Sequence, residues 1–262
     1  MFNMNKRTTN HDPRITVSFL GTNGWYDTDT GNTICVLIET PNEYVVLDAG
    51  NGIHKLDQDI KSSSKPIYLF LSHFHLDHVI GLHVLGKFKF KQGMTICIPK
   101  GTKKLLKTLT SQPFTLPLAR LDFPVKIVEI GKSNKAIKFL EQALLMDHPV
   151  PCLGYRFNFQ GKVITYVPDT GFCQNAVMLA QDADLLIAEC AFKAGQHATC
   201  WSHLNPETGA EIAKKAKAKK LVLVHFDAEI YPEFNDRLVA QQQARRIFKN
   251  TVTTKDGQII KI

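Results

Sequence analysis

Four potential metal ligands occur within residues 73–78 of the sequence, namely His73, His75, Asp77 and His78. They follow the apolar run 67–71, which predicts a buried β-strand. Side chains alternate between faces in an extended chain, so His73 and His75 can point towards one ion. Asp77 and His78 lie where the chain is expected to turn into a helix, and they can reach a second ion. Imidazoles and a carboxylate without a thiolate suit zinc, manganese or iron, so this segment predicts a two-metal site.

Three distant polar residues are candidates to complete this site. His148, Asp169 and His225 each follow an apolar segment that predicts a strand. Strand ends commonly present functional groups to a cleft. The two carboxylate oxygens of Asp169 could bridge both ions. Together with the first segment, these residues predict a dinuclear metal centre.

The composition indicates one large domain. The chain has 262 residues, of which 44% are hydrophobic, which is enough for a sizeable core. We therefore predict a domain over residues 14–262, preceded by a flexible segment, residues 1–13. The start of the chain lacks the apolar stretch of a signal peptide, and no apolar run is long enough to span a membrane, so a cytoplasmic location is expected. The six cysteines show no CxxC spacing and are expected to be reduced.

Short β-rich runs alternate with helical patterns and predict a layered α/β domain. Strands are predicted over residues 14–20, 33–39, 44–48, 67–71, 94–98, 154–159, 162–167, 185–189 and 221–224. Helices are predicted over residues 101–109, 172–181, 206–218 and 235–248, and Asn205 before Pro206 predicts an N-cap. The dipeptide Gln160-Gly161 predicts a tight hairpin.

From Thr16 to His225, this pattern resembles the metallo-β-lactamase superfamily. The resemblance implies a four-layer αββα sandwich with the metals at one edge, between the two sheets. It also implies that Asp48, in the segment LDAG, helps to orient the metal-binding loop. The ligands that it implies for the first metal are His73, His75 and His148, and those for the second are Asp77, His78 and His225, with Asp169 as the bridge.

Four segments are most similar to the ribonuclease Z branch of this superfamily and its phosphodiesterase relatives. They are LGT (20–22), HPVPCLGYRF (148–157), PDTG (168–171) and SHLN (202–205). The tRNA-processing enzymes of the branch carry a long arm between the positions of His148 and Asp169, where this chain has only 20 residues. Residues 21–27 also lack the cysteines of the structural zinc site in the phosphonate-pathway cyclic phosphodiesterase. The resemblance therefore implies a short, armless member, a group that acts on smaller phosphodiesters.

The residues suggest how such a site could work. Two divalent ions would lower the pKa of a water molecule and neutralise charge on a phosphoryl group. Asp77 could orient or deprotonate that water, and His203 is the candidate general acid, because imidazole titrates near neutral pH. Glu189 could support His203 from a strand end, or it could form a structural salt bridge. Trp25, with its neighbour Tyr26, could stack a base or pack against the protein.

We therefore predict a dinuclear metal-dependent hydrolase, and specifically a phosphodiesterase for small or cyclic nucleotide-like substrates. Zinc is the expected metal, with manganese or iron as alternatives. The alternative functions are a ribonuclease Z-like RNA endonuclease, an ester, lactone or thioester hydrolase, and a non-catalytic metal-binding module. The net charge of +8 is a mild bias towards anionic partners and does not by itself indicate nucleic acid. A homodimer is expected by analogy with the branch. Residues 111–120, which contain two prolines, are either a lid over the site or a cap on the core.

Overall fold

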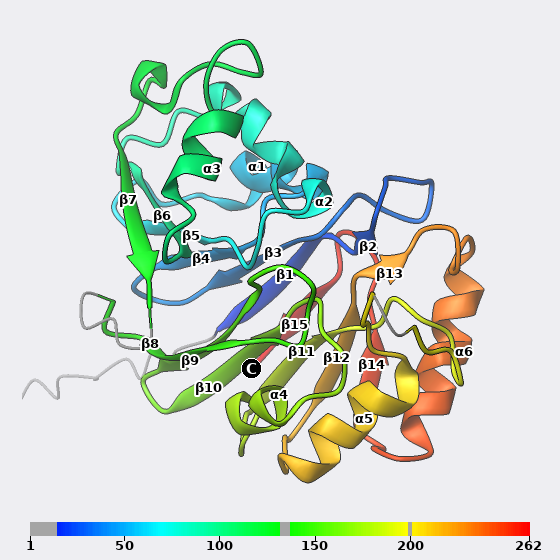
Figure 1. The fold of residues 1–262 in the computed structure, drawn as a ribbon. Coiled ribbons are helices and arrows are strands. Elements are labelled where there is room, and N and C mark those ends of the chain that lie inside the picture. Colours follow the sequence, from blue (N-terminus) through cyan, green and yellow to red (C-terminus); the bar gives the residue numbers. More distant parts are fainter. Residues whose placement is uncertain (1–14, 132–136, 199–200) are drawn as a thin grey trace, which may run out of the picture.

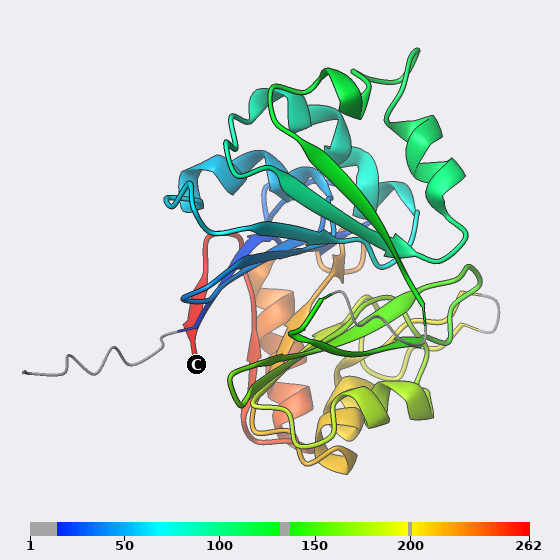
Figure 2. The same ribbon diagram turned by 90° about the vertical axis from the view of Figure 1, so that its left-hand side faces the viewer.

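Two β-sheets lie face to face, and helices cover the outer surface of each (Figure 1). This computed structural model describes residues 15–131, 137–198 and 201–262. Residues 1–13 and Cys200, about which the sequence made predictions, lie outside the described residues. A view turned by 90° shows the same layers, with the two sheets between the two groups of helices (Figure 2). The predicted αββα arrangement is therefore confirmed.

The first sheet has the strand order β15-β1-β3-β4-β5-β6-β7. Its strands are β1 (Thr16–Gly21), β3 (Cys35–Glu39), β4 (Tyr44–Leu47), β5 (Ile67–Phe70), β6 (Met94–Pro99), β7 (Val125–Ile130) and β15 (Ile259–Lys261). β4 and β5 are parallel and in register, with Leu47 opposite Phe70. The segments that follow these two strands therefore start side by side, and they carry Asp48 and the predicted histidine cluster.

The second sheet has the strand order β14-β12-β11-β10-β9-β8. Its strands are β8 (Leu140–Leu145), β9 (Leu153–Phe159), β10 (Lys162–Val167), β11 (Leu185–Glu189), β12 (Leu221–Val224) and β14 (Thr251–Thr253). β10, β11 and β12 are parallel, which brings Asp169, Glu189 and His225 to one edge of the sheet. A short parallel pair, β2 (Asn23–Gly24) with β13 (Phe226–Asp227), lies beside this edge.

The helices cover the outer faces of both sheets. The first sheet is covered by α1 (Leu56–Asp59), α2 (Leu76–Val79) and α3 (Lys103–Leu109), with short 3-10 helices at Asn51–Lys55, Ile80–Lys87 and Leu118–Arg120. The second is covered by α4 (Gln174–Leu179), α5 (Pro206–Lys215) and α6 (Phe234–Arg245). The side chain of Asn205 accepts a hydrogen bond from the Thr208 N–H at 2.9 Å, so the predicted N-cap of α5 is confirmed.

The central core lies between the sheets and is rich in aromatic rings. Phe70 of the first sheet contacts Tyr155 and Phe157 of the second, with ring centroids 5.1 and 5.0 Å apart. Such edge-to-face contacts add to the burial of apolar surface. Replacing one of these rings with alanine would cost about 3–5 kcal/mol of stability. This core clamps the two sheets together, and so it fixes the distance between the two halves of the site.

The hairpin between β9 and β10 closes in two residues, as predicted. Gln160 (φ 55°) and Gly161 (φ 91°) both adopt the left-handed conformation that tight hairpin turns require. Phe159 pairs directly with Lys162. The two strands and this turn occupy most of the interval between His148 and Asp169, which therefore contains no arm.

The nine predicted strands are present with ends within two residues of those expected, whereas edge strands were missed. β7 contains two exposed charged side chains among mostly half-buried apolar ones, and β14 and β15 are three residues long. Such strands exist because a neighbouring strand pairs with them, which local periodicity does not reveal. The cysteines among the described residues are free, as expected. None of the described helices has the length and apolar character needed to cross a membrane.

Candidate metal centre

The histidine segment leaves β5 and enters α2 directly. β5 ends at Phe70, so His73 and His75 lie in the loop after it rather than in a strand. His75 has extended backbone and precedes the first residue of α2. Asp77 and His78 then fall in that helix's first turn, and the His78 ring lies 4.1 Å from the His73 ring, centroid to centroid. This loop-to-helix transition brings four side chains to one place within six residues.

The first group of potential ligands contains residues that follow strands of both sheets. The ligand atoms of His73, His75, His148 and Asp169 all lie within 4.8 Å of one another. Nε2 of His148 lies 3.3 Å from Nδ1 of His75, and Nε2 of His73 lies 3.8 Å from Oδ2 of Asp169. This group matches the side chains that the sequence assigned to a first metal.

The second group lies directly beside the first. It contains Asp77, His78 and His225, also within 4.8 Å. Nε2 of His225 lies 3.0 Å from Nε2 of His78 and 3.1 Å from Oδ2 of Asp77. Oδ1 of Asp169 is 3.1 Å from His78 Nε2, whereas its Oδ2 faces His73. The two oxygens of Asp169 therefore face different groups, which is the geometry of a bridging carboxylate.

The chemistry of these side chains fits divalent cations. Nε2 of His73 is buried without a hydrogen-bond partner among the described residues. Burial, reinforced by the neighbouring His78, holds the pKa of His73 well below its usual range. Burial also lowers the pKa of His148 to about 4. Neutral imidazoles with free lone pairs are the form that binds metal, and the adjacent carboxylates favour positive charge.

Asp48 orients His78 of the second group through a hydrogen bond. It is fully buried and has a left-handed backbone (φ 57°) at the end of β4. Its Oδ2 accepts hydrogen bonds from His78 Nδ1 at 2.8 Å, from the Ser72 hydroxyl at 2.8 Å and from the Tyr166 hydroxyl at 2.7 Å. Its Oδ1 accepts from the Ser72 N–H at 2.7 Å. These contacts fix the His78 ring so that Nε2 faces Asp169.

His203 lies on the cavity side of the second sheet and pairs with Glu189. Its Nδ1 is 2.8 Å from Oε1 of Glu189, a fully buried carboxylate that also accepts the N–H groups of Thr170 and Ala191. Burial lowers the pKa of His203, but the Glu189 carboxylate outweighs it and raises this pKa to about 9. The contact that the sequence suggested between Glu189 and His203 is therefore present.

A short backbone segment closes the site from the side of β2. A Cβ atom on Gly24 would lie 2.5 Å from the His225 ring, so only glycine allows this approach. The N–H of Trp25 donates to Oδ2 of Asp77 at 2.9 Å. His225 itself has a left-handed backbone (φ 54°), a conformation that is costly outside glycine and is common at functional sites.

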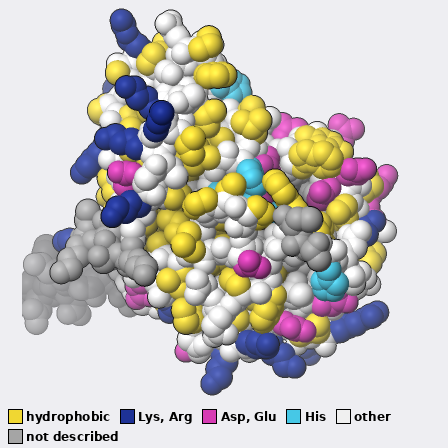
Figure 3. Space-filling model, in the orientation of Figure 1, with side chains coloured by type: hydrophobic (Ala, Val, Ile, Leu, Met, Phe, Trp, Pro, Cys, Tyr) yellow, Lys and Arg dark blue, Asp and Glu magenta, His cyan; other side chains and the backbone are white. Residues whose placement is uncertain are grey.

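Four residues of the two groups line a cavity of about 640 Å³, namely His75, Asp77, Asp169 and His225. Its wall is rich in aromatic side chains, and within the described part of the chain no Lys or Arg lines it. The side chains in the wall that face the ligand groups are Trp25, Tyr26, Leu76, Phe192, Trp201 and His203. Figure 3 shows a histidine near the centre of this face among hydrophobic side chains, whereas Lys and Arg gather at other edges.

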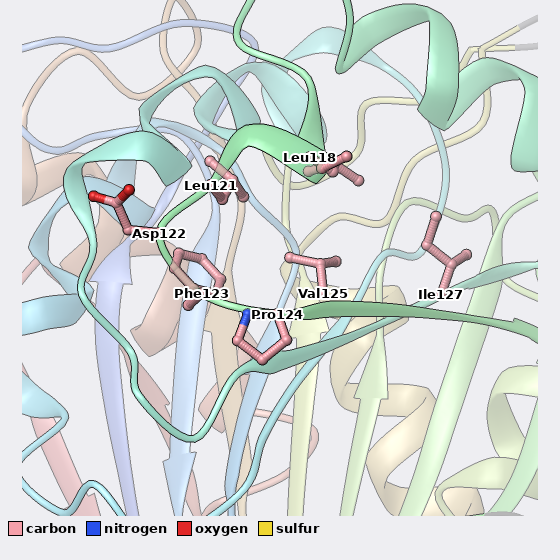
Figure 4. A pocket seen from close by; sticks show the side chains of 8 residues that line it. Leu118, Leu121, Asp122, Phe123, Pro124, Val125 and Ile127 are labelled. Atoms are coloured by element: carbon pink, nitrogen blue, oxygen red, sulfur yellow. The ribbon is translucent and has the colours of Figure 1, made fainter.

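Another pocket, of about 630 Å³, lies away from the histidines beneath the 3-10 helix Leu118–Arg120 (Figure 4). Leu121 and Phe123 line it, and its one carboxylate, Asp122, pairs with Lys89. It contains no cluster of potential metal ligands among the described residues. Leu118 packs on the core of the first sheet, and none of residues 111–120 lines the metal-site cavity. The structure therefore does not support a lid, and it does not support a core cap made by the aromatic side chain of this segment either, because Phe114 is 65% exposed.

Three contacts of the site were not foreseen. The Trp201 ring stacks on His75, with centroids 5.0 Å apart and planes at 10°. Ser72 and Tyr166 donate to Asp48. Ser72 directly precedes the histidine cluster, which was a usable signal, but Trp201 and Tyr166 reach the site only through the packing of the sheets.

Comparison with known proteins identifies the family. Residues 43–226 match the family described as "Beta-lactamase superfamily domain". The chain is 27% identical to Ribonuclease Z of Enterococcus faecalis, over 94% of this chain and 97% of that protein. That alignment extends over 311 positions, more than the 262 residues of this chain, so the relative contains segments without a counterpart here.

Solved structures show the same fold. The metallo-beta-lactamase fold protein YhfI from Bacillus subtilis has a TM-score of 0.77 at 21% identity, covering 95% of this chain and 100% of that one. A diphosphatase from the PhnP family has a TM-score of 0.70 at 17% identity, covering 95% and 97%. This fold implies divalent metal ions where the two groups of His and Asp side chains lie. The chain therefore belongs to the metallo-β-lactamase superfamily and is a metal-dependent hydrolase.

Proposed function

We propose that this protein is a phosphodiesterase that hydrolyses small phosphodiesters with two divalent cations. Zinc is the metal that we expect. The observation that supports it most directly is the position of Asp169, whose two oxygens face two separate groups of ligands. The side chains that would hold the cations are His73, His75 and His148 in one group and Asp77, His78 and His225 in the other, with Asp169 shared.

The cations would lower the pKa of water and neutralise negative charge on a phosphoryl group, which is the chemistry that phosphodiester hydrolysis needs. Asp77 would orient the attacking water, because its carboxylate is held at the cavity floor by the Trp25 N–H and by His225. His203 would donate a proton to the leaving oxygen. Its Nδ1 is occupied by Glu189, and its other ring nitrogen makes no hydrogen bond among the described residues and could serve the cavity.

The preference for a small substrate rests on two features. The direct hairpin between β9 and β10 leaves no arm with which to grip a folded RNA. The cavity wall also has no Lys or Arg among the described residues, whereas proteins usually contact the phosphate backbone of a nucleic acid through Lys and Arg side chains. A compact phosphodiester would be held by the two metal ions, by His203 and by apolar contacts.

A second candidate function is RNA cleavage, and it is favoured by the similarity to a relative named Ribonuclease Z along nearly its whole length. The longer alignment indicates that this chain lacks part of that relative. A nuclease built on this chain would have to hold RNA through surfaces outside the cavity. Its binding should then weaken steeply with salt.

The test compares substrates side by side at near-physiological salt. We expect bis-p-nitrophenyl phosphate and a panel of cyclic nucleotides to be hydrolysed, and a precursor tRNA with a 3′ trailer to be trimmed poorly. Lactone and thioester substrates should be poor. Efficient, position-specific cleavage of the precursor tRNA would replace the small-substrate proposal with the nuclease.

A further inference from the structure

Trp25 combines two features that packing does not explain. Its side chain is 61% exposed on the wall of the metal-site cavity. Its backbone is left-handed (φ 70°), a conformation that is unfavourable for a bulky residue. A strained and exposed tryptophan contributes little to the stability of the core. Its position beside the metal site therefore indicates a role other than packing.

The backbone around Trp25 is held by contacts that any residue could make. The Trp25 N–H donates to Asp77, the Tyr26 N–H donates to the Gly24 carbonyl at 3.0 Å, and the Asn23 amide donates to the Tyr26 carbonyl at 3.1 Å. The indole ring meets Tyr26 edge-on, with centroids 5.1 Å apart and planes at 68°. The backbone of Trp25 is therefore held beside the metal-site carboxylate, and its ring lies against Tyr26 at the cavity wall.

Trp201, the other tryptophan of the chain, differs in the way its ring is used. One face of its indole already covers the His75 ring at 5.0 Å. Its contact within the protein accounts for its position, since it shields a predicted metal ligand. Trp25 has no such covering role, because the ring it meets is Tyr26, which is itself 42% exposed.

We propose that Trp25 is a stacking platform for a planar aromatic group of the substrate, specifically the base of a nucleoside phosphodiester. This inference rests on the proposed phosphodiesterase function and names its substrate class. In a cavity wall without Lys or Arg in the described chain, stacking is a source of affinity that needs no charge. Every base presents a π-face, so the platform selects nucleosides without selecting one base.

The kinetic test compares two esters with the same leaving group. One is thymidine 5′-(p-nitrophenyl phosphate), and the other is the same ester of abasic 1,2-dideoxyribose. In Trp25→Gly, we expect KM for the thymidine ester to rise roughly 5- to 100-fold, the range that stacking of one base supports, with little change for the abasic ester. Trp25→Phe should retain most of the preference. An equal loss on both esters would overturn the proposal.

Glycine is chosen because it adopts φ 70° without strain, so Trp25→Gly should melt at the same temperature as the wild type or higher. Phe114→Ala is the matched control, since Phe114 is an aromatic side chain with 65% exposure that does not line the cavity. It should leave both esters unchanged. A Phe114→Ala effect equal to that of Trp25→Gly would also count against the proposal.

A binding measurement tests the platform without catalysis. Trp201→Phe retains Trp25 as the single fluorescent tryptophan, and Trp25→Phe retains Trp201. Adenosine 5′-monophosphate should quench Trp25 saturably, whereas inorganic phosphate should not. Quenching confined to Trp201 would overturn the inference. If the wild type hydrolyses neither ester, the phosphodiesterase proposal fails, while the quenching result still decides whether Trp25 stacks a base.

Discussion

Two carboxylate–histidine pairs support the site from opposite sheets. Asp48 holds His78 at the end of the first sheet, and Glu189 holds His203 at the end of the second, each across 2.8 Å. Both carboxylates are fully buried. The histidines differ, because His78 is buried among the potential ligands while His203 lines the cavity.

The difference shows how one type of pair can serve two purposes. The far nitrogen of His78 faces Asp169 and His225, so the Asp48 contact aims a ligand at a cation. The Glu189 contact instead keeps His203 charged at neutral pH, since it raises the pKa of that histidine to about 9 against the effect of burial. The environment of the histidine, rather than the pair itself, would decide between positioning and proton donation.

The largest effect should come from breaking the buried pair at its histidine. We expect His78→Ala to abolish hydrolysis and to remove at least one of two ions per chain, because His78 belongs to the second ligand group. Metal content by mass spectrometry and turnover should be measured on the same sample. A variant that retains both ions and its activity would contradict the dinuclear proposal.

His203→Ala should lower turnover by roughly 10²–10⁴-fold, the range for loss of a general acid. Metal content should stay at the wild-type value, in contrast to His78→Ala. The deficit should shrink on a p-nitrophenyl ester, whose leaving group needs little protonation. Equal losses on good and poor leaving groups would show that His203 does not act as the acid.

Asp48→Asn should weaken metal affinity by about 10–100-fold, because it removes the charge that orients His78. Asparagine tolerates the left-handed backbone at this position, so the fold should be retained. Titration with a competing chelator measures the affinity. Unchanged affinity would mean that Ser72 and the surrounding packing suffice to hold the His78 ring.

Glu189→Gln should have the smallest effect at neutral pH and a visible one in alkali. The carboxylate favours protonated His203, so its loss lowers the pKa of His203 and removes the acid form at lower pH. The basic limb of the turnover profile should therefore move to lower pH by about 1–3 units. If the basic limb does not move, or moves to higher pH, Glu189 does not raise the pKa of His203.

Much of the scaffold, and the proximity of the potential ligands, could be predicted from local pattern. Apolar runs predicted strands such as β10, β11 and β12, and the polar residues at their ends predicted which side chains would meet. The spacing of His73, His75, Asp77 and His78 was informative because neighbours in sequence need no tertiary structure to be near one another. The Gln160-Gly161 turn predicted the absence of an arm for the same reason.

The sequence by itself thus determined the family, the types of the potential ligands and the compact hairpin, since these depend on residues close together along the chain. Tertiary structure alone decided the contacts that aim and tune them. Asp48 meets the Tyr166 hydroxyl across 118 positions of sequence, and Trp25 meets Asp77 across 52. It also decided that Trp25 is exposed at the cavity while Trp201 covers a histidine, because exposure depends on how the loops pack around the two sheets rather than on residue type.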